Sequence, residues 1–328
     1  MEEIRADGHF GNLRILTTST CRMRCGYPGE DIMWCHNEGM ERNKVPEADL
    51  DRMLTTVAYF RANFGIDHVT LAGLQPRLDD DLLGFIERLR AQGITKVSLV
   101  SHGLDLVPWL LRLRSAGLSD VVLSIQAFER AAYADIMGVD AFDNALAVID
   151  ACHRMELPIT VNRVLLRGYH SDIPAFLAWA ARRNLRVRLY DVLWMPGQEA
   201  QFLTHHVSWQ ELTGLWESLV ERITVWTYGL PGRINIVFWL RGGGSVETNV
   251  NAPKRQHTTP LCLSCGLKDA CAEGWLGCGI RVTADQKVTP CVLRPDLALP
   301  LLPDGSQYVG PATLTTYLAG ENHEPAGR

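Results

Sequence analysis

Short apolar runs rich in Val, Ile and Leu alternate with segments of helical periodicity from Leu13 to Asp191. One helical segment is bounded clearly, since the carboxylates of Asp79–Asp81 suit a helix N-terminus and Gly93 follows its last turn. The predicted strands are Leu13–Thr17, His68–Leu71, Lys96–Val100, Asp120–Ser124, Ile159–Val164 and Val187–Asp191. The predicted helices are Glu47–Asn63, Asp79–Gln92, Leu106–Ser115, Phe142–Met155 and Ile173–Arg183. Alternating strands and helices predict an α/β fold with a parallel sheet.

Six such units are too few for a closed eight-fold barrel, so we expect a partial (β/α)6 barrel, with a doubly wound sheet as the alternative. After Asp191 the pattern changes: Trp209–Ile223 predicts one more helix, and Arg241–Ser245 a flexible loop. From Pro260 onward Cys, Gly and Pro dominate, which predicts a small module organised around metal. We therefore expect a barrel domain over residues 1–225 and a second domain over residues 226–328.

Composition and charge narrow the class of protein. Hydrophobic residues are 47% and charged residues 21%, ordinary values for a globular protein, and the net charge of −5 argues against a broad nucleic-acid surface. The sequence contains no apolar run of about 18 residues, the length that a membrane-spanning helix needs. The residues after Met1 do not have the basic-then-apolar profile of a secretory signal. We expect a cytoplasmic protein that binds neither nucleic acid nor a membrane.

The nine cysteines are clustered, which favours metal binding over a disulfide framework. Three lie between Cys21 and Cys35 and five between Cys262 and Cys291, while Cys152 lies within an apolar helical segment and is predicted to belong to the core. The first group follows the first predicted strand, and the loops after barrel strands carry active sites. Three thiolates predict an iron–sulfur cluster with one iron lacking a protein ligand. A zinc site is the alternative, with His36 as its fourth ligand.

This segment resembles the cluster loop of the radical S-adenosylmethionine (SAM) superfamily. The first spacing is kept as Cys21-x3-Cys25, and an aromatic residue, Trp34, precedes Cys35. The second spacing is nine residues instead of the usual two, and we interpret residues 26–33 as a turn-rich insertion that returns Cys35 to the cluster.

Further motifs resemble the GTP 3′,8-cyclase family over about 280 residues. The family's Gly-Gly-Glu-Pro corresponds to Gly73-Leu74-Gln75-Pro76, and its Thr-Asn-Gly to Ser101-His102-Gly103. Gln75 in place of Glu keeps a hydrogen-bond acceptor but loses its charge. The residues that this resemblance assigns to SAM are Trp34, Gly73, Gln75, Ser101, Ser124 and Asn162.

Several cations that a triphosphate would need are missing from the matching positions. Asp79 stands where the family has an Arg, although Arg77 is near, and the family's Arg-x-Arg is reduced to Gly279-Ile280-Arg281. Recognition of a triphosphate needs several converging cations, so these losses predict a less charged substrate. Candidate substrate ligands for a carboxylate or phosphate are Arg14, Arg188 and Arg281, each of which is alternatively a structural ion-pair partner.

The C-terminal cysteines resemble those of an auxiliary iron–sulfur domain, with Ala284–Lys287 as the turn of a hairpin. The predicted ligands are Cys262, Cys265, Cys271 and Cys291, with Cys278 as the alternative or a buried neighbour. A four-thiolate zinc site is again possible.

The resemblance implies two [4Fe-4S] clusters, SAM, and an electron donor such as flavodoxin or ferredoxin. Reductive cleavage of SAM would give a 5′-deoxyadenosyl radical that abstracts hydrogen from a small molecule, for which a nucleoside or sugar nucleotide is favoured. The outcome would be cyclisation, C–C bond formation, rearrangement or decarboxylation. Two alternatives stay open: a maturase that modifies a peptide or protein, and a non-catalytic metal-binding scaffold.

Overall fold

The structure is a computed structural model of the 328-residue chain. It describes residues 11–30, 44–227, 234–250, 259–277, 279–302 and 305–321. Across these ranges, none of the helices combines the length and the apolar character that crossing a membrane requires.

The strands of the described residues form one twelve-stranded sheet whose centre is the predicted repeat. Six parallel strands lie side by side in chain order, which confirms the six predicted strands and excludes the doubly wound alternative, whose strand order reverses. These strands are β1 (Asn12–Leu16), β2 (His68–Ala72), β3 (Lys96–Ser101), β4 (Asp120–Ser124), β5 (Ile159–Leu165) and β6 (Arg186–Asp191).

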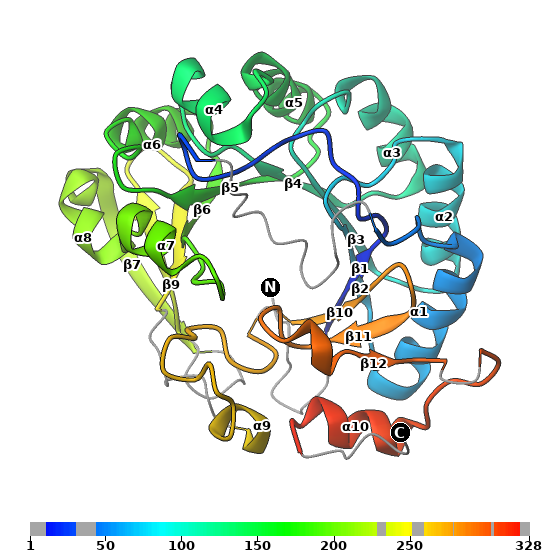
Figure 1. Cartoon of the computed structure of the whole chain (residues 1–328). Helices are drawn as coiled ribbons and strands as arrows, with labels where there is room; N and C mark the ends of the chain where they lie inside the picture. The colour runs from blue at the N-terminus through cyan, green and yellow to red at the C-terminus, as the bar shows by residue number, and fades with distance from the viewer. Residues whose placement is uncertain are drawn as a thin grey trace.

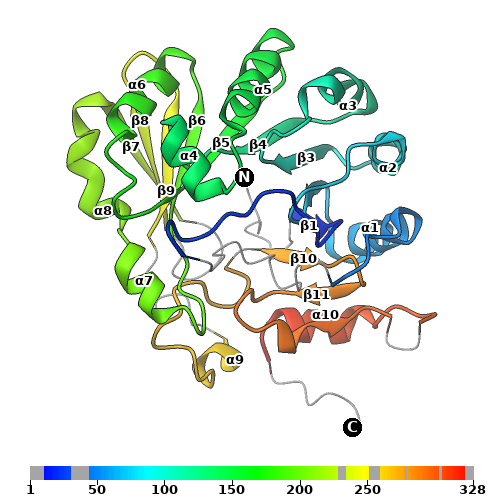
Figure 2. The same cartoon turned by 45° about the horizontal axis from the view of Figure 1, so that its top comes forward.

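The long helices between the barrel strands lie around the outside of this sheet, as Figures 1 and 2 show. The first helix begins where the Asp49 carboxylate accepts hydrogen bonds from the backbone N–H groups of Asp51 and Arg52, and it ends at Gly65 in the left-handed conformation. The α-helices are α1 (Leu50–Phe64), α2 (Asp80–Ala91), α3 (Leu110–Ala116), α4 (Arg130–Met137), α5 (Phe142–Arg154), α6 (Ile173–Arg182), α7 (Glu199–His205), α8 (Trp209–Leu212), α9 (Pro260–Leu263) and α10 (Pro311–Leu318). Short 3₁₀ helices are η1 (Val107–Trp109), η2 (Thr213–Leu215), η3 (Glu217–Leu219) and η4 (Pro295–Leu297).

The prediction of a helix over Trp209–Ile223 was wrong after the first turn. Only α8 is α-helical, and after η2 and η3 the chain enters strand β7 (Val220–Thr227). Gly214 weakens a helix at its middle, and the β-branched and aromatic residues from Ile223 to Thr227 favour a strand once β8 (Ile234–Leu240) pairs with them.

Strands from the C-terminal third extend both edges of the barrel sheet. Beside β6 lie β9 (Ser245–Asn249), β8 and β7, while β10 (Ile280–Val282), β11 (Lys287–Thr289) and β12 (Leu299–Pro300) lie beside β1. The β10–β11 hairpin confirms the predicted turn at Ala284–Lys287. Apolar residues of this region belong to the same core as the barrel, and the domain boundary at residue 225 stays a prediction.

The two faces of the barrel strands differ sharply in polarity. Side chains that face the helices, such as Leu13, Val69 and Val97, are fully buried and apolar. The alternate positions face the lumen and are mostly polar: Asn12, Arg14, His68, Thr70, Lys96, Ser98, Asp120, Thr160, Asn162, Arg186 and Arg188. Closed barrels usually fill this space with branched apolar side chains, so the polar lumen indicates a ligand chamber.

Candidate active site

The first cysteine group lies in the loop after β1, where the sequence predicts it, and α4 holds this loop in place. The backbone N–H of Arg24 donates to the carbonyl of Met137 at 2.9 Å, and that of Gly26 donates to the carbonyl of Ile136 at 3.1 Å. Cys25 Sγ lies 3.7 Å from Met137 Sδ. The sulfur of Cys21 accepts a hydrogen bond from the Met23 N–H at 3.3 Å, a contact typical of ligating thiolates.

The start of the insertion before the third cysteine forms the expected tight turn. Glu30 N–H donates to the carbonyl of Tyr27 at 3.0 Å around Pro28 and Gly29, and Gly29 has a φ of +78° that glycine adopts without strain. The Tyr27 ring is buried and stacks on His205 of α7. Trp34 and Cys35 lie outside the described residues, so their convergence with Cys21 and Cys25 stays a prediction.

The loops after β2 and β3 meet beside this cysteine loop. Gly73 has a φ of +108°, and a Cβ there would lie 2.6 Å from the Thr18 carbonyl oxygen, so the glycine lets the two loops touch. Gln75 and Cys21 line the same cavity of about 430 Å³.

A contact joins Gln75 and His102, two of the residues that depart from the family motifs. The His102 Nε2–H donates to Gln75 Oε1 at 2.6 Å, while His102 Nδ1 accepts from the Leu104 N–H at 3.4 Å. Burial, followed by the positive charge of Arg22, lowers the pKa of His102 to about 4, so the ring is neutral near pH 7. The Ser101 hydroxyl accepts a hydrogen bond from the Gly103 N–H at 3.0 Å.

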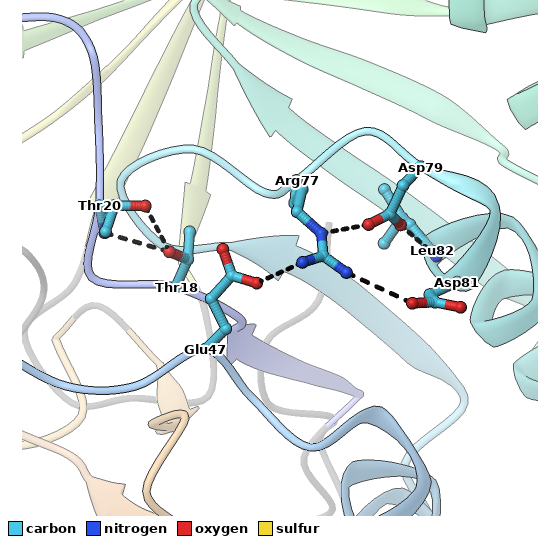
Figure 3. Close-up of polar contacts among 7 residues, drawn as sticks. All are labelled: Thr18, Thr20, Glu47, Arg77, Asp79, Asp81 and Leu82. Atoms are coloured by element: carbon cyan, nitrogen blue, oxygen red, sulfur yellow. Dashed lines mark hydrogen bonds and ion pairs between the residues drawn. The ribbon is translucent and has the colours of Figure 1, made fainter.

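Arg77 lies near Asp79, the position at which the family has an arginine, and it forms ion pairs with three carboxylates (Figure 3). Its guanidinium contacts Glu47 at 3.0 Å and Asp81 at 3.3 Å, and it also pairs with Asp79, whose carboxylate caps α2 at the Leu82 N–H. The loss of a triphosphate site stays a prediction.

The lumen contains a cavity of about 620 Å³ that three predicted residues line: Arg14, Asn162 and Arg188. Asn162 and Arg188 are register partners on β5 and β6, and Ser124 is the partner of Asn162 on β4. The Asn162 side-chain oxygen is buried without a hydrogen-bond partner among the described residues.

Arg281 lies beside Arg14 on the neighbouring strand β10 and is 1% exposed. Its Nη1 donates to the Thr289 carbonyl at 3.4 Å within the hairpin. Its contact with substrate stays a prediction.

Three of the four described cysteines of the C-terminal group accept N–H···S hydrogen bonds. Cys262 accepts from the Trp275 N–H at 3.1 Å, and Cys271 accepts from the Gly274 N–H at 3.5 Å. Cys265 accepts from the Leu267 N–H at 3.5 Å and from Arg294 Nη1 at 3.6 Å. Burial raises the pKa of the Cys291 thiol to about 11.

Within the described ranges, no three His, Cys, Asp or Glu side chains lie close enough together to hold a metal ion. Cys35 and Cys278 lie outside these ranges. The surroundings nevertheless fit thiolate ligands, because backbone N–H groups reach the sulfurs of Cys21, Cys262, Cys265 and Cys271. Cys152 is fully buried, which confirms its assignment to the core.

Sequence reasoning missed the residues contributed by β8 and β9. Glu247 of β9 is 5% exposed in the lumen wall, where it pairs with Arg186 and Arg188, and Asn235 of β8 donates to it at 3.1 Å. The polar residues at alternate positions of β1–β6 could have predicted a polar lumen. The residues next to Glu247 in the sequence give no indication that Glu247 lies in the lumen wall.

The sequence model of the Radical SAM superfamily matches residues 15–180, half of the chain, and the chain belongs to this superfamily. It is an enzyme of this class, and membership implies a [4Fe-4S] cluster and SAM as cofactors.

Its similar proteins include probable GTP 3′,8-cyclases. That of Saccharolobus islandicus strain Y.N.15.51 is 32% identical over 295 residues, covering 89% of this chain and 85% of the relative. That of Thermoplasma volcanium is 25% identical over 290 residues, covering 87% and 81%.

Solved structures with a similar fold include Streptococcus suis SuiB bound to S-adenosylmethionine, with a TM-score of 0.58 and 12% identity. That match covers 96% of this chain and 66% of SuiB, just under two thirds of its length. Native anSMEcpe with bound AdoMet has a TM-score of 0.53 and 15% identity, covering 85% of this chain and 74% of that one. At these identities the likeness concerns the fold.

Proposed function

We propose that this enzyme uses a [4Fe-4S] cluster held by Cys21, Cys25 and Cys35 to generate a radical from SAM, which acts on a small polar molecule in the barrel lumen. The observation that carries the proposal is the polar cavity of about 620 Å³ within a barrel whose first loop presents the cysteines. When bound, the cluster and SAM supply a carbon radical that abstracts a hydrogen atom from the substrate.

The chain's own contribution is to position SAM and exclude water. The backbone at Gly73 and the Gln75 carbonyl would face the SAM amine, with Trp34 and Ser101 nearby by analogy with the family. The unpartnered Asn162 oxygen supports a hydrogen bond to SAM, with Ser124 beside it on β4. Holding both reactants within the barrel would replace a bimolecular encounter with an oriented one and keep competing hydrogen donors away.

A nucleoside or sugar nucleotide is the proposed substrate class. The relatives are probable GTP 3′,8-cyclases, and the polar lumen supports a ligand rich in hydrogen-bonding groups. Arg14, Arg188 and Arg281 are the proposed substrate ligands. Cyclisation, C–C bond formation, rearrangement or decarboxylation would follow hydrogen abstraction.

The C-terminal cysteines Cys262, Cys265, Cys271 and Cys291 would hold an auxiliary [4Fe-4S] cluster, with Cys278, outside the described residues, as the alternative ligand. The N–H···S hydrogen bonds at three of them support ligating thiolates. This cluster would bind the substrate or accept an electron from the product radical, and a flavodoxin or ferredoxin would reduce the first cluster.

The test is anaerobic reconstitution of the full chain followed by iron analysis and assay of 5′-deoxyadenosine formed from SAM under a strong reductant. We expect about eight irons per chain, the content of two four-iron clusters. The Cys35→Ala variant should lose about four of them and all SAM cleavage, whereas Cys152→Ala, a core cysteine, should keep both. Bound zinc, or iron without SAM cleavage in the parent protein, would favour the scaffold alternative.

A further inference from the structure

A buried charge cluster forms one wall of the lumen where β6, β8 and β9 meet. The Glu247 carboxylate accepts hydrogen bonds from Arg186 Nε at 3.0 Å and Arg188 Nε at 3.3 Å. Its other oxygen accepts from Asn235 Nδ2 at 3.1 Å. Arg188 and Glu247 are direct register partners on β6 and β9, so the sheet itself brings their side chains together.

Glu247 is ionised in this setting. Burial alone would raise its pKa, but Arg188 and Arg186 outweigh burial and hold the pKa of Glu247 below its usual value. One carboxylate therefore occupies two of the lumen's guanidinium groups, the groups that a phosphate chain would otherwise recruit.

Asn235 adds an acceptor to the same wall. It is 6% exposed, its amide nitrogen is used by Glu247, and its side-chain oxygen is buried without a hydrogen-bond partner. A buried carbonyl oxygen of this kind is satisfied by an N–H or O–H donor of a ligand. The wall thus holds two guanidinium groups that one carboxylate already engages, together with an unpaired acceptor, an arrangement that recruits a phosphate chain poorly and suits a neutral donor group.

We propose that Glu247 is a specificity-determining residue that excludes polyphosphates from the lumen and selects a neutral substrate rich in N–H and O–H donors. This inference rests on the proposed function, because it assumes that the lumen holds the substrate. Of the two proposed substrate classes, it selects the uncharged nucleoside over the sugar nucleotide.

The experiment compares the binding of GTP and guanosine to the reconstituted full chain by anaerobic isothermal titration, since the two probes share base and sugar and differ in charge. In the parent protein, GTP should bind no tighter than guanosine, or not at all. The Glu247→Gln variant keeps the side-chain shape and should bind GTP about tenfold tighter or more, because a like charge next to the phosphates has been removed. The affinity for guanosine should change by less than about threefold, since guanosine carries no charge.

The matched control is Asp120→Asn, which removes another lumen carboxylate, the partner of Lys96 at 2.7 Å. It should change the affinity for GTP by less than about threefold if Glu247 acts locally. An equal gain in both variants, or no gain in Glu247→Gln, would overturn the proposal.

Removal of one partner from a buried cluster can prevent folding, so thermal unfolding of each variant is measured first. If Glu247→Gln does not fold, the parent protein still decides: GTP binding about tenfold tighter than guanosine binding would refute the exclusion. Cleavage of SAM by the parent protein is assayed separately. A protein without that activity would refute the proposed function, whatever the nucleotide titrations show.

Discussion

Replacement of Gly73 by alanine tests whether the loop after β2 is built around the cysteine loop. Gly73 has a φ of +108°, and an added Cβ would lie 2.6 Å from the carbonyl oxygen and 3.1 Å from the nitrogen of Thr18. These are backbone atoms, so they cannot swing aside as a side chain does. Thr18 leads directly into Cys21, and its hydroxyl forms a small turn with Thr20 (Figure 3).

The expected loss in the free energy of unfolding has two parts, which a control variant separates. Placing a side chain in a left-handed conformation costs about 1–2 kcal/mol, and overpacking against fixed atoms adds about 1–3 kcal/mol. Gly168 has a φ of +85°, but a methyl group added there would meet nothing within 4 Å, so Gly168→Ala carries only the first cost. Gly73→Ala should therefore destabilise the fold by about 1–3 kcal/mol more than Gly168→Ala.

The measurement is the free energy of unfolding in urea for the two variants and the parent. A second readout is the iron content after reconstitution, which should fall in Gly73→Ala because the displaced Thr18 moves Cys21. Equal destabilisation by the two substitutions, with normal iron content in both, would refute the proposed close approach of the loops.

Three further outcomes are expected. Arg163→Met should lower the free energy of unfolding by about 3–5 kcal/mol, because it leaves the carboxylate of Asp172 without its buried partner. Replacing both partners by apolar residues should restore part of this stability, and a double variant as unstable as Arg163→Met would contradict this account. Burial, aided by nearby cations, lowers the pKa of both His68 and His102 from 6.5 to about 4, so the unfolded chain binds more protons between these pH values. Stability should therefore fall as the pH drops from 6.5 to about 4, and urea titrations across this range should show a smaller fall when both residues are glutamine. Cys271→Ala should remove about four irons and leave SAM cleavage in place, and loss of all iron would contradict two separate clusters.

The sequence predicted the barrel because its signals are local. Each of the six strands has apolar residues at its buried positions, and two of the helices between them begin at a capping aspartate, Asp49 or Asp79. The first cysteine loop was found for the same reason, since Cys21 and Cys25 follow a strand directly.

The rest depends on contacts between distant parts of the chain. β7 gains its partner only through a hairpin, and β9 joins β6 across more than 50 intervening residues, so Glu247 carried no local sign of its place beside Arg188. The contact of Gln75 with His102 was likewise invisible, although both stood out as departures from the family motifs. The charge balance of the lumen, which decides between substrates, follows from such pairings.

The most direct test of the central claim is electron–nuclear double resonance on the reduced, reconstituted protein mixed with SAM labelled at its methionyl amine and carboxylate. If Cys21, Cys25 and Cys35 hold one cluster with an open iron, the labelled nitrogen and oxygen should show hyperfine coupling to it in the parent protein and none in Cys35→Ala. A protein that carries zinc in this loop, or a cluster whose spectrum SAM leaves unchanged, would contradict the account.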